Sequence, residues 1–282
     1  MNIRNFVVKI AIYIILVLCM LLPIEFYKIS RLYVDFNNNI NGSEVYVSIN
    51  KSKTKTKKYK ILLLGDSVGK QLYDNTKDYD DIYSLACNQA ISMAGHYFLL
   101  HNYLECNVDS LPEKVILLCT PLTFRNDLDI YAYQYFLKPF YINEYKCLFS
   151  ESLLNRIKQI PFYWTTQMPF IKTSNYSVNY EMPIEDYSII SPITECYLKK
   201  IISECRIKGI EFHIFSTPSR ESNLFNIEHS YFQAKNRHEF DAIDFDFSDY
   251  FDSFTFLPDS CFVDHVHFKS NNIPDDYLDL QN

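Results

Sequence analysis

The chain has 282 residues, and its charge divides into a basic start and an acidic body. Residues 1–60 carry ten Lys and Arg against three Asp and Glu, a net +7, whereas residues 61–282 carry 17 against 31, a net −14, which argues against nucleic-acid binding. A hydrophobic content of 48% excludes disorder over most of the chain, and five Gly are too few for glycine-rich phosphate-binding loops.

The first predicted element is an apolar segment, Phe6 to Tyr27, with charges only near its ends. As a helix, it would span roughly 33 Å, about the thickness of a bilayer core. No small-x-small cleavage site comes after it, so we expect residues 1–27 to be an uncleaved signal anchor, with a cleaved signal peptide as the alternative. Basic residues on both sides leave the orientation undecided by charge. We expect a single-pass membrane protein with its body on the extracytoplasmic side, because a short N-terminal anchor commonly translocates the rest of its chain.

Residues 28–58 are polar and indicate a juxtamembrane linker, and the globular body is expected over 59–282. Four short apolar runs in this body predict buried strands: Lys60–Leu64, Ile82–Ala86, Val115–Cys119 and Glu211–Ser216. Helical patterns lie between them at 89–104 and at 193–208, the second closed by Gly209. Strands that alternate with helices predict an α/β fold with a parallel sheet and helices on both faces.

The region 128–190 breaks this alternation and is rich in Tyr, Phe and Pro. We expect an insertion near the strand tips. Its aromatic side chains fit two interpretations, a packing layer over the core or a surface that binds substrate, and the sequence identifies no individual substrate-binding residue.

The first strand is followed by Gly65-Asp66-Ser67-Val68-Gly69-Lys70. A phosphate-binding loop needs four residues between its glycines and a Ser or Thr after the Lys, and this segment has neither. A Ser where a parallel strand enters a helix lies in the crevice where such sheets bind ligands, and its backbone N–H faces developing negative charge. The segment therefore fits a nucleophilic Ser67, the alternative being that Asp66 or Ser67 only caps the helix.

A possible base lies near the other end, in Asp264-His265-Val266-His267. A nucleophilic Ser needs a base, and the base needs an orienting carboxylate. His267 would take the Ser67 proton while Asp264 fixes its tautomer, with His265 as the competing base. A surface turn or a weak metal site is the alternative, but no other His, Cys or Asp cluster has suitable spacing, so we expect neither metal nor cofactor.

Together, the GDS segment and the D-x-x-H segment resemble the SGNH/GDSL hydrolase superfamily over roughly residues 60–275. The resemblance implies a flavodoxin-like three-layer α/β/α sandwich, no metal, and the chemistry of esterases, lipases, carbohydrate deacetylases or O-acyltransferases. It implies that Ser67 is the nucleophile and first oxyanion donor and that Asp264 and His267 complete the triad.

Two middle motifs depart from the family pattern. The second block normally supplies a Gly N–H to the oxyanion hole, but no Gly follows the second strand until Gly95, so a backbone N–H between Asn88 and Ala90 is expected to serve. The third block keeps an Asn without its Gly, and the side chain of Asn126 is the expected last donor, with Asn88 as its substitute. For both Asn residues the alternative is a turn position.

These features predict a membrane-anchored serine esterase or O-acyltransferase that acts on acyl esters of cell-surface glycan through an acyl-serine intermediate. The alternative is a catalytically silent SGNH-like protein that binds glycan or scaffolds envelope partners. A phospholipid esterase is a third interpretation, and it predicts an apolar groove beside Ser67.

Overall fold

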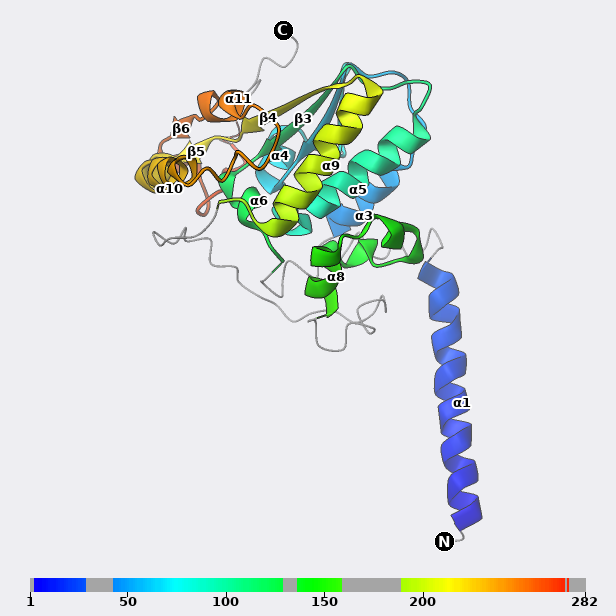
Figure 1. Cartoon of the computed structure of the whole chain (residues 1–282). Coiled ribbons are helices and arrows are strands. Elements are labelled where there is room, and N and C mark those ends of the chain that lie inside the picture. The colour runs from blue at the N-terminus through cyan, green and yellow to red at the C-terminus, as the bar shows by residue number, and fades with distance from the viewer. Residues whose placement is uncertain (1–2, 29–42, 129–135, 159–188, 272, 274–282) are drawn as a thin grey trace.

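The computed structural model describes the chain except residues 1–2, 29–42, 129–135, 159–188, 272 and 274–282 (Figure 1). Most of the predicted insertion, the start of the predicted linker and the end of the chain therefore lie outside the described residues.

The centre of the body is a four-stranded parallel sheet in the order β2-β1-β3-β4. Its strands are β1 (Ile61–Gly65), β2 (Ile82–Ser84), β3 (Lys114–Cys119) and β4 (Glu211–Ser216). Gly65 pairs with Leu118, and Cys119 with Ser216, so the carboxyl ends of these strands meet at one edge. The prediction of an α/β fold with a parallel sheet is confirmed, and the four predicted runs supply its strands.

One face of the sheet is covered by α5 (Ser92–Cys106) and α9 (Pro192–Lys208), which lie side by side in Figure 1. Side chains from alternate strand positions, such as Leu62 and Leu64, join these helices in the main core. Helix α9 begins where the Ser191 side chain accepts a hydrogen bond from Thr194 N, and it ends at Gly209, whose φ is +68°. A left-handed position of this kind favours glycine, in agreement with the sequence pattern.

The opposite face is covered more thinly. The other strand positions, such as Leu63 and Ile116, form a smaller core with Tyr73 and with Leu72 of the short helix α4 (Ser67–Leu72). After β4 the chain adds a two-stranded parallel sheet and two helices to the body. These are β5 (Ser219–Arg220), α10 (Leu224–Asn236), α11 (Ser248–Asp252) and β6 (Phe256–Leu257).

The predicted linker 28–58 is wrong over its second half. Residues Ser43–Ser52 form helix α3, which packs against α5. Its buried stripe alternates apolar and small polar residues: Val45, Ser48, Ile49 and Ser52. The buried hydroxyls are satisfied, since Asn75 Nδ2 donates to Ser48 Oγ at 2.7 Å and Asn102 Nδ2 donates to Ser52 Oγ at 3.0 Å. Hydrogen bonds across the core thus replace the apolar side chains that would have revealed this helix in the sequence.

The described part of the predicted insertion belongs to the core. It consists of two short 3₁₀ segments, η2 (Lys138–Phe140) and η3 (Asn143–Leu148), followed by helix α8 (Glu151–Lys158). Phe140 and Tyr145 are buried, and both rings pack against Phe98 of α5. For residues 136–158, the aromatic content therefore serves as a packing layer.

Helix α1 (Ile3–Lys28) extends away from the body in Figure 1. Its window Ile3–Met20 is long and apolar enough to cross a membrane, and none of it is buried against protein. The helix matches the expected membrane segment in length and composition, a test that a signal sequence also passes.

Candidate active site

Ser67 lies where β1 turns into α4, at the edge formed by the carboxyl ends of the strands. We call residues 65–69 the serine turn. Asp66 precedes the helix, and its Oδ1 accepts hydrogen bonds from Val68 N at 2.9 Å and Gly69 N at 3.0 Å. The interpretation of Asp66 as the helix cap is thus correct. Because Asp66 performs this role, the Ser67 hydroxyl is not needed for capping.

The other oxygen of Asp66 ties the serine turn to the neighbouring strand. Asp66 Oδ2 accepts from Thr120 N at 2.7 Å and from Thr123 Oγ1 at 3.0 Å, at the start of α6 (Pro121–Arg125). Asp66 is fully buried, so these four hydrogen bonds satisfy a carboxyl group that has no access to water. One side chain thereby fixes the tips of β1 and β3 relative to each other.

Both glycines of the serine turn are required by close packing. A Cβ added at Gly65 would lie 2.8 Å from Leu118 O, and one added at Gly69 would lie 2.7 Å from the same atom. The obstacle is backbone of the central strand β3, which cannot rotate away as a side chain can. These two glycines let α4 start directly against β3, and this places Ser67 at the strand edge.

The structure brings His267 onto Ser67. His267 Nε2 lies 2.8 Å from Ser67 Oγ, and His267 Nδ1 lies 2.8 Å from Asp264 Oδ2. A carboxylate can only accept a hydrogen bond, so Nδ1 carries the proton and Nε2 is the nitrogen that can accept the hydroxyl proton of Ser67. Ser67, His267 and Asp264 therefore form one hydrogen-bonded series in the order that proton abstraction from the serine requires.

Residues 264–267, here called the histidine loop, form a tight loop. Asp264 Oδ1 accepts from Val266 N at 2.9 Å and from His267 N at 2.7 Å. The loop is closed by Val263 N donating to His267 O at 2.8 Å and by an antiparallel bridge between Phe262 and Phe268. Asp264 thus orients the His267 ring with one oxygen and the His267 backbone with the other.

The same contacts keep Asp264 ionised. Partial burial opposes ionisation, but hydrogen bonds from the backbone of His267 and Val266, and then from the His267 ring, outweigh it and lower the pKa of Asp264. A carboxylate that stays charged can stabilise an imidazolium on His267, as catalysis by a serine nucleophile requires.

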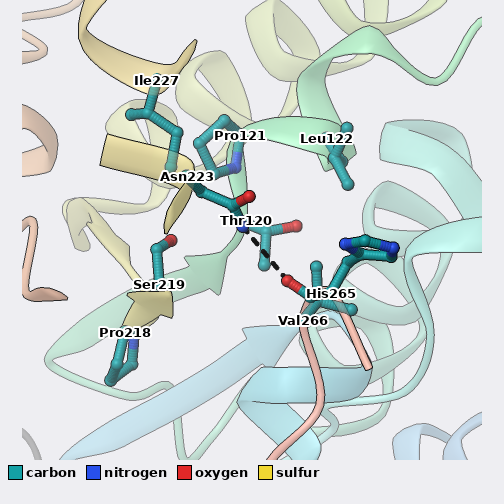
Figure 2. A pocket seen from close by; sticks show the side chains of 9 residues that line it. All are labelled: Thr120, Pro121, Leu122, Pro218, Ser219, Asn223, Ile227, His265 and Val266. Carbon is teal, nitrogen blue, oxygen red and sulfur yellow. Dashed lines mark hydrogen bonds between the residues drawn. The ribbon is translucent and has the colours of Figure 1, made fainter. Parts of the chain in front are cut away.

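The competing base, His265, does not reach Ser67. Its backbone carbonyl accepts a hydrogen bond from Asn223 Nδ2 at 3.2 Å, and its side chain lines a separate hollow, drawn in Figure 2. Of the two histidines in the motif, the geometry thus selects His267.

Two of the predicted oxyanion donors are used elsewhere. Ala90 N donates to Asn88 Oδ1 at 2.9 Å, because Asn88 caps the short 3₁₀ helix η1 (Gln89–Ile91), and Asn88 Nδ2 donates to Glu44 Oε1 at 3.1 Å. The N–H of Ala90 is thus already paired in this structure, whereas the amide of Asn88 keeps a second N–H, so the expectation that one of these residues donates to an oxyanion stays a prediction. Among the described residues, the backbone N–H groups of Ser67 and Gln89 have no hydrogen-bond acceptor.

Asn126 supports this segment. It is buried, its Nδ2 donates to Gln89 O at 2.7 Å, and its Oδ1 accepts from Leu128 N at 2.9 Å. Gln89 also lies near the β3 tip, where Thr120 Oγ1 is 3.5 Å from Gln89 Oε1. One N–H of the Asn126 amide therefore holds the Gln89 segment in place, and its second N–H is the one that could donate to an oxyanion.

Strained backbone follows both segments. Ser92 has φ 56° and ψ 179°, and Leu128 has φ 55°. Side chains rarely adopt such conformations, which cost about 1–3 kcal/mol each and persist where the surroundings enforce them. The chain thus turns sharply at Ser92 and at Leu128. Glycine would adopt these backbone conformations more readily.

No protein-family model, no curated protein and no solved structure matches this chain. The interpretation of the site therefore rests on the two sequence motifs and on the geometry of Ser67, His267 and Asp264.

A small hollow lies beside the histidine loop (Figure 2). It holds about 20 Å³ of free space, room for roughly one water-sized or methyl-sized group. Its lining is mainly apolar and comes from separate parts of the chain: Thr120, Pro121, Leu122, Pro218, Ser219, Asn223, Ile227, His265 and Val266. The sequence could not identify this lining, because the fold assembles it from several distant segments.

One cluster within the described residues has a composition that could hold a metal ion. His101 and Glu105 on α5 and Glu204 on α9 have ligand atoms within 4.8 Å of one another. His101 Nδ1 already lies 3.3 Å from Glu204 Oε1 in an ordinary polar contact. The cluster lies toward the carboxyl end of α5, whereas the segment that contacts Asn126 precedes the amino end of that helix, so it takes no part in the Ser67 site.

Proposed function

We propose that this protein is a serine ester hydrolase or O-acyltransferase of the SGNH type that works through an acyl-Ser67 intermediate. The observation that carries the proposal is the series Ser67 Oγ, His267 Nε2, His267 Nδ1 and Asp264 Oδ2, with 2.8 Å at both hydrogen bonds. The order β2-β1-β3-β4 supports it further, because it equals the first four strands of the flavodoxin-like order 2-1-3-4-5. Helices on both faces of this sheet support a three-layer α/β/α arrangement.

In the first half of the reaction, Ser67 Oγ attacks the carbonyl carbon of the ester while His267 Nε2 takes the hydroxyl proton. Asp264 stabilises the imidazolium that forms. The negative charge that develops on the carbonyl oxygen is met by the N–H groups of Ser67 and Gln89 and by the second amide N–H of Asn126. His267 then gives its proton to the departing alcohol oxygen as the ester bond breaks, which leaves the acyl group on Ser67.

In the second half, a hydroxyl group attacks the acyl-Ser67 carbonyl and His267 takes its proton. Water gives a hydrolase, and a sugar hydroxyl gives a transferase. When the bond to Ser67 Oγ breaks, His267 returns the proton to that oxygen, and the site is restored with atoms and charge in balance.

The proposed substrate is an acyl ester of cell-surface glycan. Helix α1 supports this choice, because a membrane anchor would hold the body, placed on the extracytoplasmic side, next to the glycan at the same surface.

The test is ester hydrolysis by the full chain in detergent, with p-nitrophenyl acetate and with O-acetylated polysaccharide as substrates. We expect Ser67→Ala to lower kcat by about 10³-fold or more without loss of folding. Ser260→Ala, at an exposed serine of the 3₁₀ segment η6 (Asp259–Cys261), is the control and should keep full activity. Acylated sugar on addition of an acceptor would identify a transferase. Equal activity of wild type and Ser67→Ala would refute the proposal, and glycan binding without turnover would favour the catalytically silent alternative.

A further inference from the structure

The helix that carries Ser67 also holds the backbone of the residue that follows His267. Gln71 lies four residues after Ser67, one turn along α4 and on the same side of the helix. Its Nε2 donates to Phe268 O at 3.2 Å, and its Oε1 accepts from Phe268 N at 3.0 Å. The side-chain amide thus pairs with both polar groups of Phe268, as a neighbouring strand would.

The histidine loop is also held from its other side. Arg220 Nη1 donates to Asp264 O at 3.4 Å while Nη2 donates to Asp259 Oδ2 at 2.5 Å, and Asn223 Nδ2 donates to His265 O at 3.2 Å. These contacts come from β5 and from the segment before α10. They fix the loop relative to the end of the sheet, but they do not connect it to α4.

Apolar packing also joins α4 to the loop, since Leu72 and Val266 pack against a small cluster between them. Val68 of α4 meets Phe262 and Phe268 in a small cluster, in which the two rings stack with their centroids 4.8 Å apart. Such packing resists separation of the two parts but allows sliding. The paired hydrogen bonds of Gln71 are directional, and they fix both the position and the rotation of the Phe268 backbone.

We propose that Gln71 is a positioning residue that sets the separation between Ser67 Oγ and His267 Nε2. The inference rests on the proposed function, because it assigns Gln71 a role in that reaction. Gln71 does not touch the reacting atoms. It acts through Phe268, whose backbone position determines where the preceding imidazole points.

The test compares wild type, Gln71→Met and Gln71→Glu as full chains in detergent. Met keeps the length and volume of Gln and removes both hydrogen bonds, while Glu keeps an acceptor for Phe268 N and loses the donor to Phe268 O. Gln233→Met, at a half-buried position of α10, is the matched control. We measure the rate of fluorophosphonate labelling, and kcat and KM for p-nitrophenyl acetate. Each value is normalised to the amount of protein that fluorophosphonate can label in a parallel sample.

We expect Gln71→Met to lower kcat and the labelling rate about 10- to 100-fold with KM nearly unchanged, since a displacement of about 1 Å can cost 10²-fold. The Glu variant should also be slower than wild type, and Gln233→Met should match wild type. A lower Tm with unchanged kcat would show that Gln71 only stabilises the fold and would overturn the inference. If Gln71→Met does not fold, Gln71→Glu decides by the same criteria. Absence of labelling in wild type would instead refute the proposed function, so the two failures are distinct.

Discussion

The serine turn and the histidine loop are joined by the hydrogen bond between Ser67 and His267, but they are built differently. Asp66 of the serine turn is fully buried, and two of its four hydrogen bonds come from the start of α6, 54 or more residues away. The Asp264 side chain is 41% exposed, and its hydrogen bonds come from its own loop. The serine turn is thus part of the core, whereas the loop is a preformed unit attached at the surface.

Because of this difference, substitutions in the two regions should have separate effects on the stability of the fold and on the rate of the reaction. A change at Asp66, Gly65 or Gly69 of the serine turn leaves buried groups unsatisfied or forces backbone apart, so it should mainly destabilise the fold. A change in the histidine loop alters a half-exposed unit, so it should mainly affect the reaction. Substitutions in the serine turn and in the histidine loop should therefore affect different quantities, the free energy of unfolding and kcat. A substitution outside both parts should affect stability alone.

The largest effect should come from Asp264→Asn. An amide donor facing His267 Nδ1 favours the wrong tautomer, in which Nε2 carries the proton and cannot accept one from Ser67. We expect kcat to fall about 10³- to 10⁴-fold, while the free energy of unfolding changes by less than about 1 kcal/mol. The measurement is ester hydrolysis beside urea unfolding. An Asp264→Asn variant that loses stability but keeps its kcat would contradict the claim that the histidine loop mainly serves the reaction.

Asp66→Ala should give the converse result, with a loss of about 4 kcal/mol or more in the free energy of unfolding. It leaves two backbone N–H groups of α4, Thr120 N and the Thr123 hydroxyl without their acceptor inside the core. Asp246→Ala is the control, since Asp246 accepts from Ser248 N at an exposed position and its loss should destabilise the fold far less. Similar losses in the two variants would contradict the role given to Asp66.

Gly69→Ala should cost about 2–3 kcal/mol, because the new Cβ would lie 2.7 Å from Leu118 O. Gly209→Ala provides a matched comparison: nothing lies within 4 Å of its added Cβ, and only the φ of +68° opposes it, at about 1 kcal/mol. Urea unfolding of both variants measures the difference. If Gly209→Ala cost as much as Gly69→Ala, close packing at the serine turn would not be the reason for its glycine.

The smallest effect concerns acid, which should lower stability through a residue outside the site. His96 of α5 is fully buried, neither ring nitrogen has a hydrogen-bond partner among the described residues, and burial lowers its pKa to about 3. The unfolded chain, with an ordinary His pKa of ~6.5, binds this proton more readily, so stability should fall as pH drops below about 6.5. The slope from this group approaches about 1.4 kcal/mol per pH unit.

The check for His96 is urea unfolding at pH 7 and pH 5.5. Wild type should lose about 1 kcal/mol more than His96→Leu between these values. His238→Leu, at an exposed position, should lose as much unfolding free energy between these pH values as wild type does. An equal loss in all three proteins would mean that other groups cause the acid sensitivity.

The parts that are predictable from sequence are those encoded in short contiguous runs. The buried strands appear as apolar runs such as Val115–Cys119, and α9 ends at Gly209, as its sequence predicts. The local structure of the GDS and D-x-x-H segments is determined within each segment, because Asp66 and Asp264 each accept hydrogen bonds from the residues that follow them.

The parts that are not predictable depend on contacts between distant residues. Helix α3 is hidden because Ser48 and Ser52 are buried against Asn75 and Asn102, and no local pattern shows such pairs. The sequence likewise does not show that Asn88 Oδ1 accepts the N–H of Ala90. The contact from Gln71 to Phe268 joins residues 197 positions apart.

The central claim is that His267 activates Ser67, and serine-directed labelling tests it most directly. The full chain in detergent is treated with a fluorophosphonate, and the modified residue is located by peptide mass spectrometry in wild type, Ser67→Ala and His267→Ala. The account predicts a single adduct on Ser67 in wild type, none in Ser67→Ala, and labelling at least about 10²-fold slower in His267→Ala. A folded wild type that is not labelled, or labelling of Ser67 at the same rate without His267, would contradict it.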